Sequence, residues 1–297
     1  MKTKFLLFGM ILSMLAITSC TKDSSSTSGQ TAVTSTDVVA TQKVDNALDD
    51  VSVIADDQYE VTEGSTTGKS TANYTSMFSS LTNFAISDLG STSTVRILTI
   101  TFGNSTSAMM SPCLFRGHSL QGQIILTRTI GITFPKTMTI TYNNFSINGN
   151  KLEGTTTWVR EMIGTGADLH PKTTLTMTDM KLTTSQGIYT RNGSKTREMT
   201  AGFLTRTSPT DDIFSTYGSF TTTHPDGSVF TSLIETATPL IHKTACSLIT
   251  IPMPFPVSGK LKLTKNSHYS IIDYGNGDCD NKATLTWGTK SKEITLP

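Results

Sequence analysis

Threonine alternates with apolar residues along much of this chain. From 137 to 147 the side chains of Met138, Ile140 and Tyr142 occupy every second position, and 173–183 repeats the pattern. A period of two gives a strand one apolar face and one polar face. Threonine suits the polar face, because it is β-branched and carries a hydroxyl group, and it supplies 55 of the 297 residues. We therefore expect a mainly all-β fold, a large antiparallel sheet that forms a sandwich or an open twisted layer.

The alternation slips in two places. At Asn143–Asn144 the apolar positions shift to Phe145 and Ile147, and a similar slip occurs at Asp179. One extra residue exchanges the two faces of a strand, so both slips predict β-bulges. Four glycine-containing segments are expected to be turns between strands, namely Asn148–Gly149, Asn192–Gly193, Pro225–Gly227 and Asn276–Gly277.

The last fifty residues carry a break and two further strands. Ile251–Pro256 contains three prolines, which cannot donate to a central sheet ladder, so we expect a loop or an edge there. The chain is expected to end in strands at Lys282–Trp287 and Lys292–Leu296.

One segment, 37–57, shows helical spacing instead. No glycine or proline interrupts it, and Thr36 is expected to cap its N-terminus, with Asp37 in the first turn. Its apolar residues form one stripe, which consists of Val44, Ala47, Leu48, Val51, Ile54 and Ala55. The opposite side carries Asp45, Asp49, Asp50 and Ser52. The pattern predicts one N-terminal amphipathic helix ahead of the sheet.

The charges of the chain are segregated. Residues 37–63 contain eight acids and one base, a net charge of −7, whereas 64–297 contain 20 bases and 14 acids, a net charge of +6. One interpretation is an acidic patch for a basic partner. The other, which we favour because charge runs usually mark solvated surfaces, is a solvated helix face that docks on a mildly basic sheet. The net charge of the whole chain, +1, excludes the clustered basic excess of a nucleic-acid-binding protein.

The first twenty residues have the order of a lipoprotein signal. Two lysines precede an apolar run, Phe5–Ala16, that is too short to span a bilayer, and Ile17–Ser19 leads into Cys20. This order resembles the bacterial lipobox, in which the cysteine receives a diacylglycerol group. The alternative is an ordinary signal peptide with an incidental cysteine. We expect lipidation at Cys20, with several acyl chains that anchor the protein stably.

These segments predict four parts of the chain. They are a signal peptide at 1–19, the lipidated cysteine with a flexible Ser/Thr-rich tether at 20–36, the acidic helix and its connection at 37–63, and a single β-rich domain at 64–297.

Three cysteines remain besides Cys20. An oxidising envelope compartment favours one disulfide among them and leaves one cysteine over. We expect Cys246 and Cys279 to pair, because both lie in the C-terminal strand region, with Cys113 as a buried free thiol. Pairing through Cys113 is the alternative.

Few segments suggest specific chemistry. Asn276, Asp278 and Asp280 alternate in an oxygen-rich stretch and make a weak calcium candidate, since calcium binds several oxygen ligands. The alternative is a polar turn beside Cys279. Gly64–Ser70 has one residue too few between its glycines for a phosphate-binding loop, so we expect a flexible loop there.

No catalytic motif is present. The five histidines lack metal-ligand spacing, and the sequence has no Gly-x-Ser-x-Gly elbow. The alternative of a glycosidase remains, because two of four glutamates on separate predicted strands could form its pair of catalytic carboxyl groups. These glutamates are Glu153, Glu161, Glu198 and Glu235. Five aromatic residues offer a sugar-stacking platform as one role, although core packing is the more usual role of such residues. They are Tyr142, Trp158, Tyr189, Phe220 and Trp287. We therefore expect no metal, no cofactor and no assigned catalytic residue.

Three segments and Cys20 together resemble a group of uncharacterised envelope lipoproteins of the Bacteroidota. The segments are Val-Ser-Val-Ile-Ala-Asp-Asp-Gln-Tyr at 51–59, Phe-Thr-Thr-Thr-His-Pro-Asp-Gly-Ser-Val at 220–229 and Ile-Asp-Tyr-Gly-Asn-Gly-Asp-Cys-Asp-Asn-Lys-Ala-Thr at 272–284. The resemblance implies no activity. It implies an outer-membrane location, on the periplasmic face or the cell surface. Members of the group carry another cysteine upstream of Cys113, which is missing here near Phe84, and this implies a lone Cys113 and a Cys246–Cys279 pair.

The sequence thus favours a non-enzymatic envelope protein that binds or scaffolds. Its expected partners are the membrane, through the N-terminal lipid, and a polysaccharide or an envelope protein, with no nucleic acid. An envelope glycan hydrolase is the alternative, and a structural surface-coat protein is a second.

Overall fold

The computed structural model describes residues 33–63, 76–103, 111–131, 133–205, 208–248 and 254–296. Several predictions lie outside the described residues: the signal peptide, Cys20, the tether up to residue 32, the loop Gly64–Ser70 and the start of the proline-rich segment at 251–253. In the part of the chain that is described, no helix is both long and apolar enough to cross a bilayer.

One antiparallel sheet of 15 strands confirms the predicted mainly all-β fold, as an open layer instead of a sandwich. The strands are β1 (Phe84–Ser87), β2 (Val95–Phe102), β3 (Cys113–Phe115), β4 (His118–Thr129), β5 (Lys136–Ile147), β6 (Asn150–Ile163), β7 (His170–Thr184), β8 (Gly187–Ala201), β9 (Ile213–Thr223), β10 (Val229–Ile234), β11 (Leu240–Lys243), β12 (Ser258–Lys265), β13 (His268–Asn276), β14 (Lys282–Trp287) and β15 (Lys290–Thr295). They follow one another across the sheet in chain order, except that β3 pairs with β4 alone and β11 pairs with β9 and β12.

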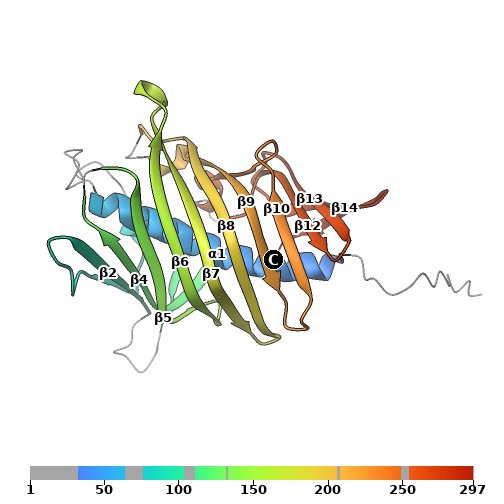
Figure 1. Ribbon diagram of the computed structural model, residues 1–297, viewed down its shortest axis with the longest axis horizontal. Helices are drawn as coiled ribbons and strands as arrows, with labels where there is room; N and C mark the ends of the chain where they lie inside the picture. The colour runs from blue at the N-terminus through green and yellow to red at the C-terminus, as the bar shows by residue number, and fades with distance from the viewer. Residues whose placement is uncertain are drawn as a thin grey trace, which may run out of the picture. The chain divides into compact units, whose positions relative to one another are not determined.

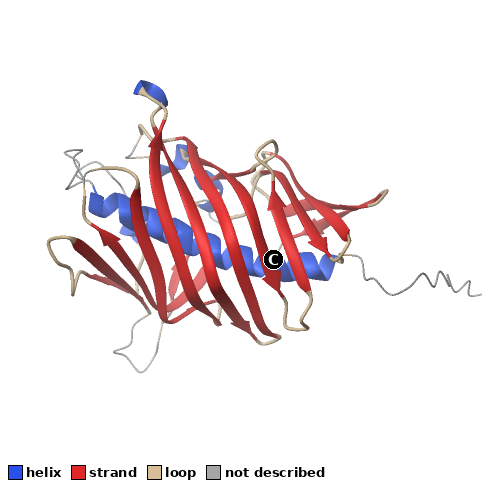
Figure 2. Cartoon of the chain, in the orientation of Figure 1, coloured by secondary structure: helices blue, strands red, loops and turns tan. Residues whose placement is uncertain are grey.

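The helical elements are few. They are α1 (Ser35–Glu63), α2 (Thr244–Ser247) and the 3-10 turns η2 (Met77–Ser80), η3 (Gly166–Asp168) and η4 (Pro209–Asp211). Figures 1 and 2 show that α1 crosses the strands along the inner side of the curved sheet. Between 35 and 62 only Thr36, Lys43 and Val61 are exposed. The helix and the inner face of the sheet therefore share a single apolar core.

The helix begins two residues earlier than the sequence predicts. Its cap is Thr34, not Thr36: the Thr34 backbone N–H donates to Asp37 Oδ2 at 2.8 Å, and the Asp37 N–H donates to Thr34 Oγ1 at 3.1 Å. This reciprocal pair is a capping box. The helix also continues past 57, because Gln58 and Tyr59 are buried and extend its packing.

The structure confirms the predicted apolar stripe of α1, whereas the prediction of a solvated acidic face is wrong. All six predicted stripe residues are buried. On the opposite side Asp50 and Ser52 are only 1% and 4% exposed, and Asp45 and Asp49 are partly buried. A helix surrounded by a sheet has no broad solvated side, so its carboxylates face the sheet.

Both predicted bulges are present. The ladder between β5 and β6 shifts between Ile140 and Ser146, and that between β7 and β8 shifts between Met177 and Met180. Asn144 and Asp179 adopt positive φ angles of 48° and 49° inside these shifts. Each bulge lets the strand keep its apolar residues on the inner face beyond the break.

Two of the four predicted turns join consecutive strands as expected, Asn148–Gly149 between β5 and β6 and Pro225–Gly227 between β9 and β10. Asn276 ends β13 and Gly277 begins its connection to β14. The turn predicted at Asn192–Gly193 is wrong, because both residues lie inside β8. A Cβ atom on Gly193 would lie 2.5 Å from Phe220 Cα, so the glycine permits close approach of β9.

Candidate functional site

Ion pairs join α1 to the inner face of the sheet. Asp37 pairs with Lys265, Asp45 with Arg191, Asp49 with Lys195, Asp50 with Arg116 and His118, Asp56 with Arg160 and Arg197, and Glu60 with Arg160. We refer to these pairs as the ion-pair interface. The acidic segment and the basic remainder of the sequence thus neutralise each other within the molecule. The prediction that the helix docks on a basic sheet is correct, but the acidic face of the helix, which was expected in solvent, is the face that contacts the bases of the sheet.

The Asp45–Arg191 pair shows how completely these charges are enclosed. The Arg191 side chain is 2% exposed; its Nε donates to Thr222 Oγ1 at 2.9 Å, and its guanidinium lies 4.2 Å from the centre of the Phe220 ring. Burial raises the pKa of Asp45, and Arg191 opposes that rise. Buried charges cost several kcal/mol each unless they are paired, so each member of the pair requires the other.

A cleft lies beside the C-terminal half of α1. It consists of a larger cavity of about 70 Å³ and a smaller one of about 20 Å³. The two adjoin, because both are lined by Val53, Met77, Arg197, Phe214 and Thr244. A water molecule needs roughly 10–15 Å³ of such space, so the cleft has room for roughly six to nine waters or one small molecule.

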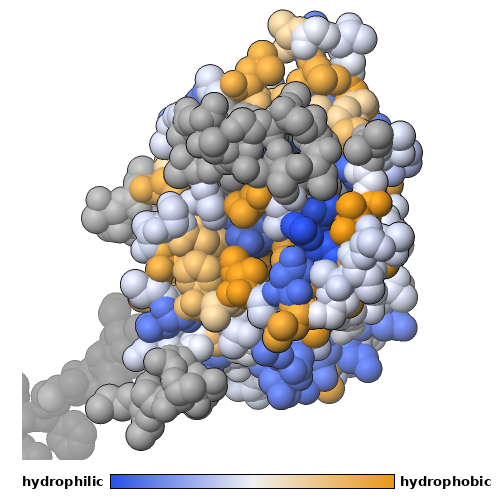
Figure 3. Space-filling model, turned by 90° about the vertical axis from the view of Figure 1, so that its left-hand side faces the viewer, coloured by the Kyte–Doolittle hydropathy of each residue, from blue (hydrophilic) through white to orange (hydrophobic). Residues whose placement is uncertain are grey.

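The larger cavity combines apolar walls with a dense group of charges. Met199 and Phe203 add to the shared apolar lining, and Asp56, Glu60 and Arg160 lie beside them. Asp56 is fully engaged: Trp158 Nε1 donates to its Oδ1 at 3.1 Å, and Arg197 Nη1 donates to its Oδ2 at 2.9 Å. Figure 3 shows the face of the molecule toward which the C-terminal end of α1 points. Hydrophobic and strongly hydrophilic residues lie next to one another on it.

Asp212 is the acid of the larger cavity without a partner. It follows η4, and among the described residues its carboxyl group makes no hydrogen bond or ion pair. Burial and the neighbouring Asp211 raise its pKa to about 7; Arg197 opposes this rise and Glu60 adds to it. This carboxyl group therefore retains its proton to a higher pH than an ordinary aspartate does.

His242 is the corresponding group of the smaller cavity. Both ring nitrogens are buried and form no hydrogen bond within the described chain, and Nε2 lies 3.7 Å from Asp49 Oδ2. Burial lowers the pKa of His242 to about 4; Asp49 opposes this, and Arg197 and Arg116 reinforce it. Unsatisfied buried groups are costly, and a bound water, ion or ligand is one way in which such a group is satisfied.

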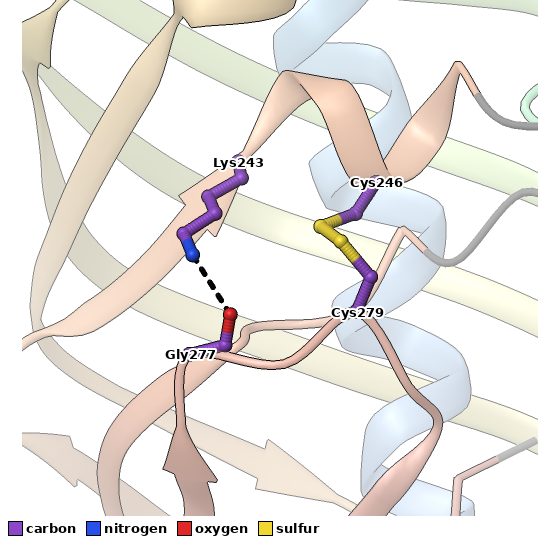
Figure 4. Close-up of a disulfide and its surroundings, with 4 residues drawn as sticks. All are labelled: Lys243, Cys246, Gly277 and Cys279. Carbon is purple, nitrogen blue, oxygen red and sulfur yellow. Dashed lines mark hydrogen bonds between the residues drawn. A yellow bond between two sulfur atoms is a disulfide. The ribbon is translucent and has the colours of Figure 1, made fainter.

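The predicted disulfide supports one wall of this cleft. Cys246 and Cys279 are bonded, with their Cα atoms 5.3 Å apart, and Cys113 is a buried free thiol, so both predictions are confirmed. Figure 4 shows the bond beside Lys243, whose Nζ donates to the Gly277 carbonyl at 2.8 Å. Because α2 lines the smaller cavity, these two links attach the wall to the connection between β13 and β14.

The calcium candidate lies in this same connection, away from the cleft. Asp280 N donates to the Asp278 carbonyl at 3.1 Å, and Asp280 Oδ1 accepts from Lys282 N at 3.1 Å. These are the local bonds of a polar turn. In the described ranges no three His, Cys, Asp or Glu side chains come together as metal ligands. Calcium binding at Asn276, Asp278 and Asp280 remains a prediction.

The four candidate glutamates are dispersed. Glu153 pairs with Lys151, Glu161 with Lys172 and Glu198 with His170, and Glu235 is exposed at the end of β10. None of them lines the cleft. The aromatic residues form no exposed platform, since Trp158, Tyr189 and Phe220 are buried and Tyr142 and Trp287 pack against the core.

Asp212, His242 and Arg197 were not singled out from the sequence. They lie on separate segments and share no motif spacing, so only the curvature of the sheet brings them together. A comparison with known proteins found no matching family model, no similar curated protein and no similar solved structure.

Proposed function

We propose that this protein is a lipid-anchored envelope protein, attached to the outer membrane through Cys20, that binds a ligand in the cleft without chemical turnover. The observation that supports binding is the lining of the cleft. Its walls are apolar, they include the carboxyl group of Asp212, and both buried ring nitrogens of His242 form no hydrogen bond within the described residues. A concave apolar pocket with a few convergent polar groups is typical of small-molecule sites.

The size of the cleft limits the ligand. With about 70 Å³ and about 20 Å³ of space, it accommodates a small molecule or the end of a polymer. A polysaccharide or an envelope protein, the ligands expected from the sequence, would enter it by a chain end.

The binding proposal can be tested by ligand-observed NMR with a library of small fragments. Thr205 lies at the larger cavity, and its neighbour Leu204 is 67% exposed and lines neither cavity. Thr205→Trp should abolish the binding of fragments that the wild type retains, and the control Leu204→Trp should preserve it. Equal fragment binding by all three proteins would refute the cleft as the site.

The anchor has a separate test. Cells that express the wild type should incorporate labelled palmitate into the protein, and Cys20→Ala should remove the label. Equal labelling of the two would contradict lipidation at Cys20.

A second candidate function, glycan hydrolysis, is favoured by one observation. The Asp212 carboxyl group, whose pKa burial raises to about 7, lines the same cavity as Glu60. Two carboxyl groups in one site, one of them with a raised pKa, are the arrangement of many glycosidases. A glycan array combined with product assays separates the two functions, since hydrolysis predicts turnover that Asp212→Asn abolishes.

A further inference from the structure

Most of the charged side chains that line the cleft are already paired within the molecule. Asp57 accepts hydrogen bonds from Ser76 Oγ and Met77 N, each at 2.7 Å. A buried charge that lacks a counter-charge is costly, so a charged ligand gains little where the counter-charges are already in use. The ion pairs in question join Arg116 to Asp50, Arg197 to Asp56, Arg160 to Glu60 and Lys195 to Asp49.

Lys243 and Asp212 stand outside these ion pairs. Lys243 directs its ammonium group to the Gly277 carbonyl at 2.8 Å, at the connection between β13 and β14 (Figure 4). The Asp212 carboxyl group makes no ion pair within the described residues, and burial raises its pKa to about 7. Below that pH it offers a ligand a hydrogen-bonding group instead of a fixed charge.

The neutral polar group of the cleft is His242. Both of its ring nitrogens are buried and form no hydrogen bond within the described residues, and burial lowers its pKa to about 4, so the ring is uncharged at neutral pH. A neutral imidazole has one N–H donor and one acceptor nitrogen. A hydroxyl group both donates and accepts, so it can partner whichever nitrogen faces the cleft, whereas an ammonium group only donates and a carboxylate only accepts.

The rest of the lining suits a ligand that carries hydroxyl groups on a carbon skeleton. The apolar side chains shared by the two cavities offer a surface to C–H groups, and the buried Thr216 and Ser247 line the smaller cavity together with His242. The cleft has room for roughly six to nine water-sized atoms, which is enough for part of a sugar ring. Thr205 at the larger cavity is exposed, so the remainder of a sugar chain can leave the cleft on that side.

We infer that the cleft binds the terminal sugar of an uncharged glycan, one of whose hydroxyl groups contacts His242. This inference rests on the proposed binding function and names the ligand class of the same site. A charged sugar would bring an ammonium or carboxylate group to a cleft whose counter-charges are used within the protein. An apolar ligand would leave the imidazole without a partner.

Three matched series of sugars test the inference by NMR titration of the mature protein at pH 6. Each series contains a neutral hexose (glucose, galactose or mannose), its 2-amino analogue, which carries an ammonium group, and its uronate, which carries a carboxylate. In at least one series the neutral hexose should bind roughly tenfold more tightly than both charged analogues, because a charge in the cleft finds no free counter-charge. If a charged analogue binds as tightly as the hexose in every series, the inference is wrong.

Two substitutions of His242 test the hydrogen bond to the sugar. His242→Phe should weaken the binding of the neutral hexose roughly tenfold, whereas His242→Gln, whose amide also donates and accepts, should change it by no more than roughly threefold. His170→Phe is the matched control, since His170 pairs with Glu198 and lines neither cavity. Unchanged binding in His242→Phe, or equal losses in both His242 variants, would overturn the inference.

The failure of this inference can be told apart from the failure of the proposed function. If a His242 variant does not fold, the three series on the wild type still decide the matter. If no hexose binds but Thr205→Trp excludes another fragment, the glycan is wrong and binding in the cleft stands. If Thr205→Trp excludes nothing, both are wrong.

Discussion

The ion-pair interface and the cleft are built from the same helix and the same sheet and share several charged residues, among them Asp56 and Arg197, but two polar groups of the cleft stand apart. Along the interface the carboxylates of α1 meet bases of the sheet, as Asp45 meets Arg191 and Asp49 meets Lys195. In the cleft, Asp212 and His242 have no hydrogen-bond partner in the described chain. Under the proposed function, the difference separates polar groups that the fold pairs from groups that a ligand would contact.

The largest effect should come from breaking one buried pair of the interface. Arg191→Met leaves Asp45 buried without a counter-charge, so we expect a loss of about 3–5 kcal/mol in the free energy of unfolding, measured in urea. Lys282→Met is the control, because the Lys282–Glu293 pair is 57% and 67% exposed and should contribute about 0–1 kcal/mol. Similar losses in both variants would show that the interface is not special.

The next largest effect should come from the disulfide, which supports the cleft and not the interface. It spans a sequence separation of 33, for which loop-closure entropy gives about 3–4 kcal/mol. Cys246→Ser/Cys279→Ser should lower stability by that amount. Hydrogen exchange should accelerate first in α2 and leave the middle of α1 protected. Uniform acceleration would contradict this division.

The interface was partly predictable from the sequence. The opposite net charges of 37–63 and 64–297 implied docking of helix on sheet, and the apolar stripe identified the buried residues. The stripe did not reveal that the sheet encloses the helix. That depends on the length and curvature of the sheet, so Asp50, expected in water, lies at 1% exposure.

Local sequence patterns predicted the two bulges correctly and one of the turns wrongly. The phase slips located the bulges at Asn144 and Asp179, because face alternation is a local property of a strand. Asn192–Gly193 has the composition of a hairpin turn, but Asn192 Oδ1 accepts from Asp179 N at the bulge and Gly193 makes room for β9. Both roles depend on neighbouring strands. The cleft was not predictable for the same reason.

A third test concerns His242, whose ring nitrogens form no hydrogen bond within the described residues. The pKa of His242 in the folded protein, about 4, lies below its ordinary value of 6.5, so the unfolded chain binds the extra proton first and stability falls as pH drops from 6.5 toward 4. His242→Phe removes this proton uptake. We expect it to be more stable than the wild type by roughly 2 kcal/mol at pH 5 and nearly equal at pH 7.5. Equal pH profiles would show that His242 is satisfied.

The smallest effect should come from Asp212. Its contribution to stability depends on pH in the opposite direction to that of His242. The folded pKa of Asp212, about 7, lies above the ordinary 3.8, so the folded state retains the proton longer and stability falls as pH rises from 4 to 7. Asp212→Asn should remove this loss. Since the group is partly exposed, we expect a gain of only about 1 kcal/mol at pH 8 and none at pH 4. A loss of stability at pH 8 would mean that Asp212 has a cationic partner.

Within the described residues, the Asp212 carboxyl group of the cleft makes no ion pair, whereas the Asp49 carboxylate of the interface pairs with Lys195. Carboxyl carbon chemical shifts followed by NMR from pH 3 to 9 test this difference directly, with Asp49 as the internal comparison. We predict that Asp212 titrates near pH 7 in the ligand-free protein. Burial would raise the pKa of Asp49, but Lys195 outweighs it and holds that pKa well below its usual value, so we expect Asp49 to show no titration in this range. Titration of Asp212 near pH 4, as for a solvated or paired carboxylate, would contradict the account.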